Sequence, residues 1–245
     1  MWGSCILIPI LLWSTPQASQ EARPKEEGPK VLTTEEAQKL LDELRDDLAS
    51  EDRSARLLAL DKLAKVSHPL VTKALVKQLA HRQDIIRSEA ARALGAQTDN
   101  AAREALVKAL KHPQNRESSM VLESLVEALG RTGYPATAYS ELANLFNEAD
   151  PGVRKAVAVA FGLQKEVRAF GILIEWIDEP IPKDPHAPEN PPASWWRLRW
   201  QTWQTIRFAV QDALKAITGK TFKTREEALI WAATPEAKKR KIELK

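Results

Sequence analysis

Apolar residues recur in this sequence with helical spacing, in four segments that share one pattern. Residues 75–79 and 106–110 have nearly the same letters 31 positions apart, and residues 142–146 and 173–177 follow the same pattern. In each segment the first, second and fifth positions are apolar, and these positions lie on one face of an α-helix. The pattern therefore predicts four amphipathic helices that bury the same face.

Each of these helices is preceded by another helical pattern, which ends in Leu or Phe followed by a small residue. We expect the glycines among these small residues to adopt the left-handed conformation that ends many helices. The preceding helices are also rich in alanine, so two of them can approach closely. The terminal pairs are Leu63-Ala64, Leu94-Gly95, Leu129-Gly130 and Phe161-Gly162, and seven residues before each Leu or Phe stand Arg56, Arg87, Leu122 and Arg154. Two helices per repeat, neither able to bury its apolar face alone, predict an α-solenoid.

This pattern resembles the HEAT repeat, in particular the short bacterial form found in secreted proteins. The resemblance implies an all-α fold, a right-handed α-solenoid of about four to six helical hairpins. Composition agrees, because unbranched helix formers dominate and there are only nine Gly and two Tyr. The resemblance is carried by Asp84, Ile86, Arg87, Ala90, Ala91, Leu94 and Gly95, followed by a helix with Leu106 and Leu110.

Breaks in the helical pattern divide the chain. Thr33 and Glu36 stand in capping-box register ahead of a helix, and Ser194 is placed to cap a later one. Residues 180–193 contain six Pro and cannot be helical. We expect a signal peptide over 1–18, a linker over 19–33, an N-terminal capping helix over 34–50, four HEAT-like repeats over 51–179, a Pro-rich loop over 180–193, a Trp-rich helical repeat and cap over 194–235, and a basic tail over 236–245.

The apolar run of residues 5–13 is too short to cross a bilayer about 30 Å thick as a helix. Its length matches the hydrophobic region of a signal peptide, and small polar residues follow it, although no Lys or Arg precedes it. We therefore expect cleavage near Ala18 or Ser19 and export to the periplasm or the extracellular space. Cleavage would remove Cys5, the single cysteine.

Charge and reactive side chains argue against most enzyme classes. The net charge is +3, all of it contributed by the last ten residues, which we expect to form a frayed tail. No His is followed by Glu or paired with another His at helical spacing, so we expect no metal, cofactor or catalytic site. His81 and His112 stand at equivalent positions, where we expect each to favour the negative end of a helix dipole. Thr218 to Thr221, although similar in letters to a phosphate loop, is expected to be a turn.

Four Trp fall within nine residues, interleaved with arginines, and two interpretations stay open. The cluster of Trp195, Trp196, Trp200 and Trp203 could form a stacking platform for bases, sugars or a peptide. Alternatively, the last three could fill the space beneath the Pro-rich loop and the last repeat, with Trp195 the most exposed. Periodicity favours the second interpretation.

We interpret the chain as a non-enzymatic scaffold that binds a protein or peptide partner through its concave surface. The third positions of the four motifs are Lys77, Lys108, Asn144 and Glu175. If these second helices line the concave face, the groove grades from basic to acidic, whereas a DNA groove would stay basic. The candidate binding residues are Lys73, Lys77, Lys108, Lys111, Asn144, Glu175, Trp195 and Arg199.

Two alternatives have weaker support. A nucleic-acid-binding protein, similar to HEAT-fold glycosylases, would use the four lysines and the Arg/Trp helix as contacts. An enzyme that acts on a prosthetic group is suggested only by HEAT-like repeats in pigment-attachment proteins, and no residues here support it.

Overall fold

The computed structural model describes residues 28–182, 184, 187–188 and 190–242, so the expected signal peptide and His186 lie outside the described residues. Most of the described chain is helical. In chain order the elements are β1 (Lys30–Val31), α1 (Thr34–Glu43), α2 (Arg45–Ala49), α3 (Arg53–Ala64), β2 (Val66–Ser67), α4 (Pro69–Gln78), α5 (Asp84–Leu94), α6 (Asn100–Leu110), α7 (Pro113–Arg116), α8 (Ser119–Thr132), η1 (Ala136–Ala138), α9 (Tyr139–Glu148), α10 (Pro151–Leu163), η2 (Val167–Ala169), α11 (Phe170–Ile174), α12 (Ala193–Thr218), α13 (Arg225–Ala232) and α14 (Pro235–Lys239).

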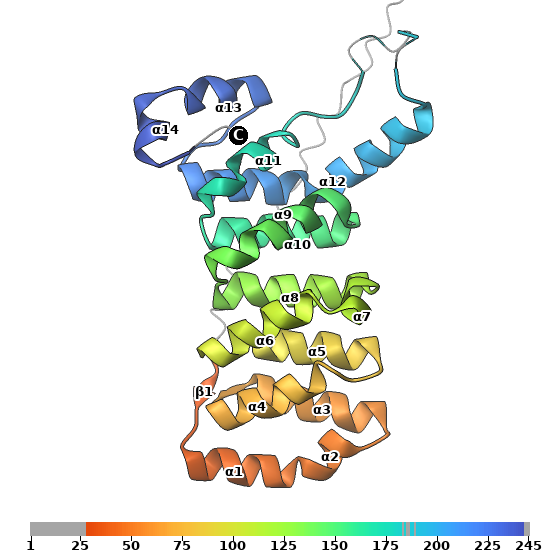
Figure 1. The fold of residues 1–245 in the computed structure, drawn as a ribbon, viewed down its shortest axis with the longest axis vertical. Helices are drawn as coiled ribbons and strands as arrows, with labels where there is room; N and C mark the ends of the chain where they lie inside the picture. The colour runs from red at the N-terminus through yellow and green to blue at the C-terminus, as the bar shows by residue number, and fades with distance from the viewer. Residues whose placement is uncertain (1–27, 183, 185–186, 189, 243–245) are drawn as a thin grey trace, which may run out of the picture.

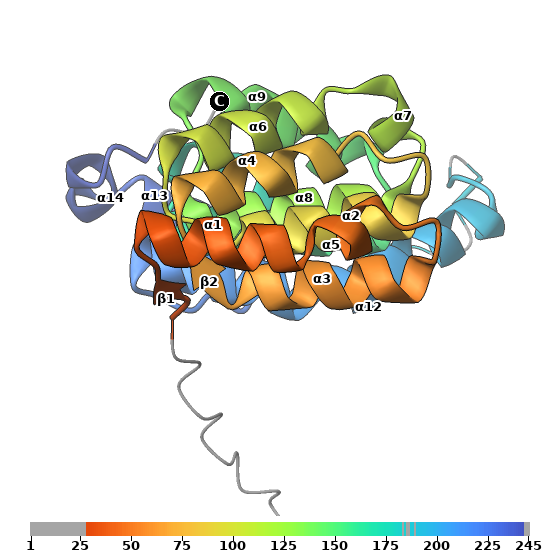
Figure 2. The same cartoon turned by 90° about the horizontal axis from the view of Figure 1, so that it is seen from below.

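The helices stack in two columns that run the length of the molecule (Figure 1). One column contains α3, α5, α8, α10 and α12, each packed on the next. The other contains α1, α4, α6, α9 and α11, and the view along the stack shows it on the opposite side (Figure 2). This arrangement confirms the all-α solenoid, because each repeat contributes one helix to each column.

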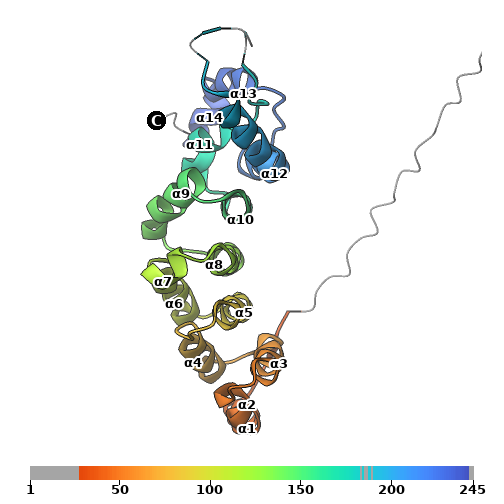
Figure 3. The ribbon, with the colours of Figure 1, turned by 90° about the vertical axis from the view of Figure 1, so that its right-hand side faces the viewer.

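The stack is bowed, and the column of α3, α5, α8, α10 and α12 lies on the concave side (Figure 3). We call it the inner column and the other the outer column. The expectation that Lys77, Lys108, Asn144 and Glu175 line the concave face is therefore wrong. The alanine-rich helices approach one another closely, while the larger side chains of the outer column need more room, so the stack curves toward the inner column.

The first and fifth apolar positions of the repeat are buried, as the pattern predicts, whereas Val76, Val107 and Ala143 at the second position are half-buried. Leu75, Leu106 and Leu142 are fully buried, as is Leu173 at the end of the array. Together with the alanines of the inner column they belong to one continuous hydrophobic cluster. Each repeat therefore depends on its neighbours for burial.

The repeat glycines have a different role from the one expected. Gly95 has a φ of −63°, and Gly130 and Gly162 lie inside α8 and α10, so none of the three is a left-handed cap. The left-handed glycine at a helix end is Gly219, which closes α12 in the expected turn. A Cβ on each repeat glycine would lie 3.0 Å from the Cα of an alanine on the next inner helix, in the pairs Gly95 with Ala128, Gly130 with Ala160 and Gly162 with Ala213. These glycines let consecutive inner helices touch through their backbones.

One of the two expected helix starts is confirmed. Thr33 and Glu36 form a capping box at α1, and Asp150 caps α10 ahead of Pro151. Ser194, however, is not the cap of α12, which begins at Ala193 with Pro192 at the cap position. The extended backbone of Pro192 already presents its carbonyl to the amides of the first turn.

Both ends of the described chain pack onto the solenoid. At the N-terminal end, β1 pairs in parallel with β2, so part of the expected linker belongs to the fold. At the C-terminal end, Ala237 and Ile242 are buried, so the expectation of a frayed tail is wrong as far as residue 242. Ala237 and Ile242 stand on either side of four consecutive basic residues, and burying these two apolar side chains outweighs the freedom of a loose end. Among the described helices, none is both long and apolar enough to span a membrane.

Candidate protein-binding surfaces

Two buried arginines hold the edge of the solenoid where outer helices connect to inner ones. Arg87 is 1% exposed, and its Nε donates to Asn115 Oδ1 at 2.7 Å while Nη2 donates to Asp84 Oδ1 at 2.7 Å. Arg56 donates from Nη1 to Gln78 Oε1 at 2.9 Å and from Nη2 to the carbonyl of Ser50 at 2.6 Å. Arg56 thus ties α3 to the connection before it and to α4, and Arg87 ties α5 to the connection before it and to α7, so both have a structural role.

The third arginine of this series, Arg154, lies in a different environment. It donates to the carbonyls of Ala149 and Asn147 at 2.7 and 2.6 Å. Beyond them lies the ring of Trp176, whose centroid is 5.3 Å from the Arg154 Cζ, and the Arg199 Cζ lies 4.4 Å from the same centroid. Burial lowers the pKa of Arg154, and the positive charge of Arg199 lowers it further. Two guanidinium groups therefore share one aromatic ring.

A pocket of about 410 Å³ opens beside these two arginines, and three predicted binding residues meet there. Glu175, Trp195 and Arg199 all line it, together with Arg154 and Trp176. The Glu175 carboxylate is paired with Arg225 at 2.5 Å. The pocket thus combines two cations, exposed aromatic surface and one carboxylate that is already neutralised in part; we call it the arginine–tryptophan pocket.

The other predicted residues lie elsewhere. Lys73, Lys77, Lys108 and Asn144 are on the outer helices α4, α6 and α9, and Lys111 directly follows α6. Lys108 lines a separate groove between α4 and α6. The contacts assigned to nucleic-acid binding are therefore divided, because the lysines lie on the outer column and the Arg/Trp helix belongs to the inner one.

Exposed apolar side chains are concentrated on the inner column. Among the described residues, no large exposed apolar side chain lies on α1, α4, α6, α9 or α11. Three of the large exposed apolar residues, Val31, Ile181 and Ile230, lie outside both columns. The remaining ones lie on the inner column and are Leu58, Met120, Val159, Leu163, Trp195, Leu198, Trp200 and Phe208. Sequence reasoning missed this surface, although Val159 and Leu163 interrupt the polar face that α10 would otherwise present.

A groove of about 380 Å³ lies on this inner surface between α8 and α10. Val159 and Leu163 supply apolar lining, and Glu127, Arg131 and Lys155 stand around it with charges of both signs. Ion pairs within single helices neutralise some of the charges of the inner column, as between Asp61 and Lys65, Glu89 and Arg92, and Glu127 and Arg131. The groove therefore offers apolar contact next to charges of both signs.

The members of the Trp cluster differ in burial, so neither interpretation offered by the sequence describes all of them. Trp203 is half-buried, and its Nε1 donates to the Ile177 carbonyl at 3.3 Å, as a space-filling role predicts. Trp195 is 44% exposed, as expected. Trp200 is 37% exposed, so it does not fill the core; its Nε1 donates to Glu179 Oε1 at 2.7 Å across the start of the Pro-rich loop.

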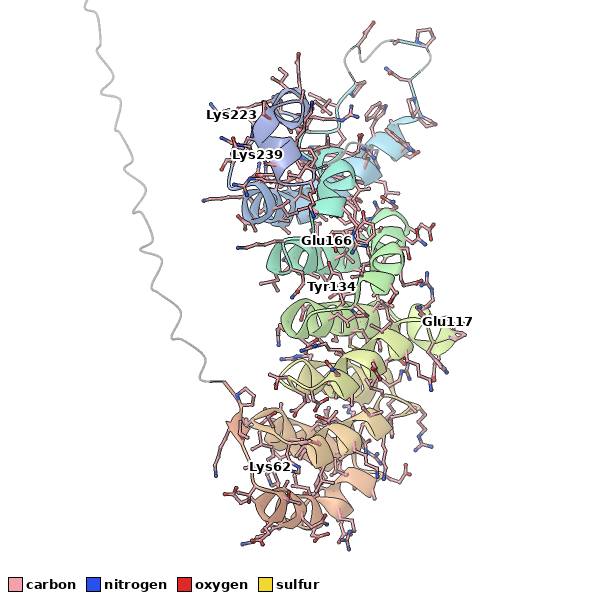
Figure 4. The ribbon with its side chains drawn as sticks, turned by 60° about the vertical axis from the view of Figure 1, so that its left-hand side comes forward. Lys62, Glu117, Tyr134, Glu166, Lys223 and Lys239 are labelled. Atoms are coloured by element: carbon pink, nitrogen blue, oxygen red, sulfur yellow. The ribbon has the colours of Figure 1, made fainter. Side chains whose placement is uncertain are left out.

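The opposite edge of the solenoid carries a cluster of Tyr134, Tyr139, Glu166 and Arg168, and Figure 4 shows Tyr134 and Glu166 close together there. Arg168 pairs with Glu166 at 2.6 Å, and its Cζ lies 4.2 Å from the Tyr139 ring centroid. Burial raises the pKa of Tyr134, so this hydroxyl stays protonated and cannot act as a base. The cluster joins two consecutive connections and is structural.

The histidines differ from the expectation of charged residues at helix ends. His81 accepts a hydrogen bond at Nδ1 from the amide of Gln83 at 3.1 Å. Burial lowers the pKa of His81, and the charge of Arg56 adds to the effect, so the ring is neutral at pH 7. His112 stands at the N-cap position of α7. Within the part of the chain that the structure describes, no group of three or more His, Cys, Asp or Glu could hold a metal ion.

Comparison with known proteins agrees with this architecture. The family model described as HEAT repeats matches residues 37–126, which extend from α1 into α8. No curated protein matches the chain. Beyond residue 126 the inner column continues through α10 and α12 with the same contacts between glycine and alanine. Residues 37–126 therefore match HEAT repeats, and the described chain folds as an all-α solenoid.

Proposed function

We propose that this protein is a non-enzymatic scaffold that binds a protein or peptide partner on its concave, inner-column face. HEAT repeats generally serve as protein-interaction scaffolds. The observation that carries the proposal is the distribution of exposed apolar side chains, which populate the inner column and are absent from the described outer helices. Exposed apolar surface of this kind marks interaction sites, because leaving it in water is unfavourable.

The arrangement of the side chains supports a protein partner over a nucleic acid. A nucleic-acid site needs several cations on one surface to neutralise phosphates. Here part of the charge of the inner helices is paired within single helices, exposed apolar side chains lie on the same helices, and Lys77 and Lys108 lie on the other column. Apolar contact surrounded by mixed charge is the usual composition of a protein-recognition surface.

A double variant, Leu163→Glu with Phe208→Glu, is expected to reduce partner capture at least about tenfold, since a central apolar contact is worth 1–2 kcal/mol or more. Both side chains are exposed, at 57% and 62%, so the thermal unfolding midpoint should stay nearly unchanged. The measurement is a quantitative pull-down from a lysate of the native host. The matched control is Lys77→Glu with Lys108→Glu, which alters exposed residues of the outer column and should capture the partner as the wild type does.

Loss of capture in the outer-column control, with the inner-column variant unaffected, would contradict this assignment. Sub-micromolar binding of duplex DNA by the wild type that is lost on changing Lys77 and Lys108 would instead favour the nucleic-acid alternative. Neither result is expected, because Lys77 and Lys108 lie on the outer column, apart from the exposed apolar side chains of the inner column.

We also propose that the protein is exported, supported by the apolar run of residues 5–13 and the small polar residues after it. When the full chain is produced in a Gram-negative host, the mature protein should appear in the periplasm. Sequencing should find its first residue near Ser19 or Gln20. Protein that stays in the cytoplasm and begins at Met1 would contradict export.

A further inference from the structure

We propose that the arginine–tryptophan pocket binds the side-chain carboxylate of an acidic residue in the partner, next to a large apolar residue. The proposal rests on the function proposed above and names what this end of the inner column would recognise. It follows from the arginine series, from the unpaired Arg199 and from the apolar side chains at the pocket.

The arginine series shows that Arg154 lacks the acceptor that its counterparts have. Arg56 donates to Gln78, which lies 22 residues later, and Arg87 donates to Asn115. Among the described residues, Arg154 has no such side-chain acceptor; the ring of Trp176 lies beside it and accepts no conventional hydrogen bond. A guanidinium group has five N–H donors, and Arg154 uses two of them on backbone carbonyls. A structural arginine has thus kept donors for a ligand.

Arg199 supplies the second cation. Among the described residues its guanidinium has no hydrogen-bond acceptor and no carboxylate partner, and its contacts are with the rings of Trp176 and Trp195 at 4.4 and 5.6 Å. The lowered pKa of Arg154 reflects repulsion between the two cations as well as burial. An anion beside both would offset this repulsion and accept the remaining N–H groups, and a planar carboxylate matches the fork of a guanidinium.

The rest of the pocket favours a peptide carboxylate over a phosphate. Glu175 lines the same pocket, and its negative charge opposes a doubly charged phosphate more than a singly charged carboxylate. Trp195 and Leu198 also line it and are 44% and 63% exposed, so they offer apolar contact to a neighbouring side chain. An acidic residue beside Leu, Phe or Trp fits this combination.

The test uses a random heptapeptide library, acetylated and amidated so that only side chains supply carboxylates, captured by the full-length protein. We expect enrichment of Asp or Glu next to a large apolar residue. Arg199→Gln should reduce binding of an enriched peptide at least about tenfold, because a charge-assisted pair is lost. Arg199→Lys, which keeps the charge and loses the fork, should restore only part of the binding. The matched control is Arg197→Gln, an exposed cation on the same helix that does not line the pocket.

Several outcomes would overturn the inference. These are enrichment without acidic residues, equal binding by the Arg199→Gln and Arg197→Gln variants, enrichment only in a library with free C-termini, or displacement of the peptides by sub-millimolar inorganic phosphate. Peptides that depend on Leu163 but ignore Arg199 would overturn the pocket and leave the proposed scaffold function standing. No peptide enrichment at all would contradict both.

Discussion

Leu106→Asp is expected to lower the thermal unfolding midpoint of the whole array by about 10 °C or more, or to prevent folding. Leu106 is fully buried in the core between repeats. A carboxylate there loses its hydration without gaining a partner, which costs several kcal/mol, and each kcal/mol lowers the midpoint of a protein of this size by about 2–4 °C. Because repeats depend on their neighbours, the effect should extend beyond α6. The unfolding midpoint is measured by far-UV circular dichroism during heating.

The control is Lys108→Asp, which places the same carboxylate two residues later on the same helix. Lys108 is exposed, so its new charge stays hydrated and the midpoint should change by little. If the two variants unfold at the same temperature, the assignment of the buried face of α6 is wrong.

Gly130→Leu is expected to have the second largest effect, destabilising the array by about 1–3 kcal/mol. The new Cβ would meet the Cα and Cβ of Ala160 at 3.0 Å, so α8 and α10 would have to separate. Separation opens the contact on which the inner column depends. The free energy of unfolding, measured by urea titration, should fall accordingly.

The matched substitution is Gly171→Leu in α11. A Cβ at Gly171 meets no atom within 4 Å, so the new side chain begins in open space instead of against a neighbouring helix. Leucine is also a better helix former than glycine by just under 1 kcal/mol. The two Gly→Leu variants should therefore change stability in opposite directions, and a destabilised Gly171→Leu variant would argue that propensity and space do not decide the difference.

The architecture could be predicted from the sequence because it depends on local spacing. A helix that repeats its apolar face at residues such as Leu75 and Leu106 must bury that face against a neighbour, whatever the neighbour is. The start of α1 could be predicted for the same reason, because Thr33 and Glu36 satisfy backbone groups only three residues away. Burial and capping of this kind need no knowledge of distant contacts.

The function of the glycines and the location of the binding surface needed the tertiary structure. A glycine near a helix end is typical of a left-handed cap, and only the contact with Ala160 shows that Gly130 serves close approach instead. Likewise, the direction in which the stack bends depends on the sum of small differences in spacing between helices. The spacing of residues along one helix contains no information on that sum, so the sequence assigned Lys77 to the wrong side.

In the arginine–tryptophan pocket, too, some features could be predicted from the sequence and others needed the tertiary structure. The repeat spacing places Arg154 at a recurring arginine position, and the sequence pattern predicts that Trp195 is exposed. That Arg199, which follows a long Pro-rich loop, reaches the ring of Trp176 is visible only in the folded chain. Periodic burial is set by neighbours a few residues away, whereas a pocket depends on where separate helices end in space, and that position is fixed by the packing of the whole array.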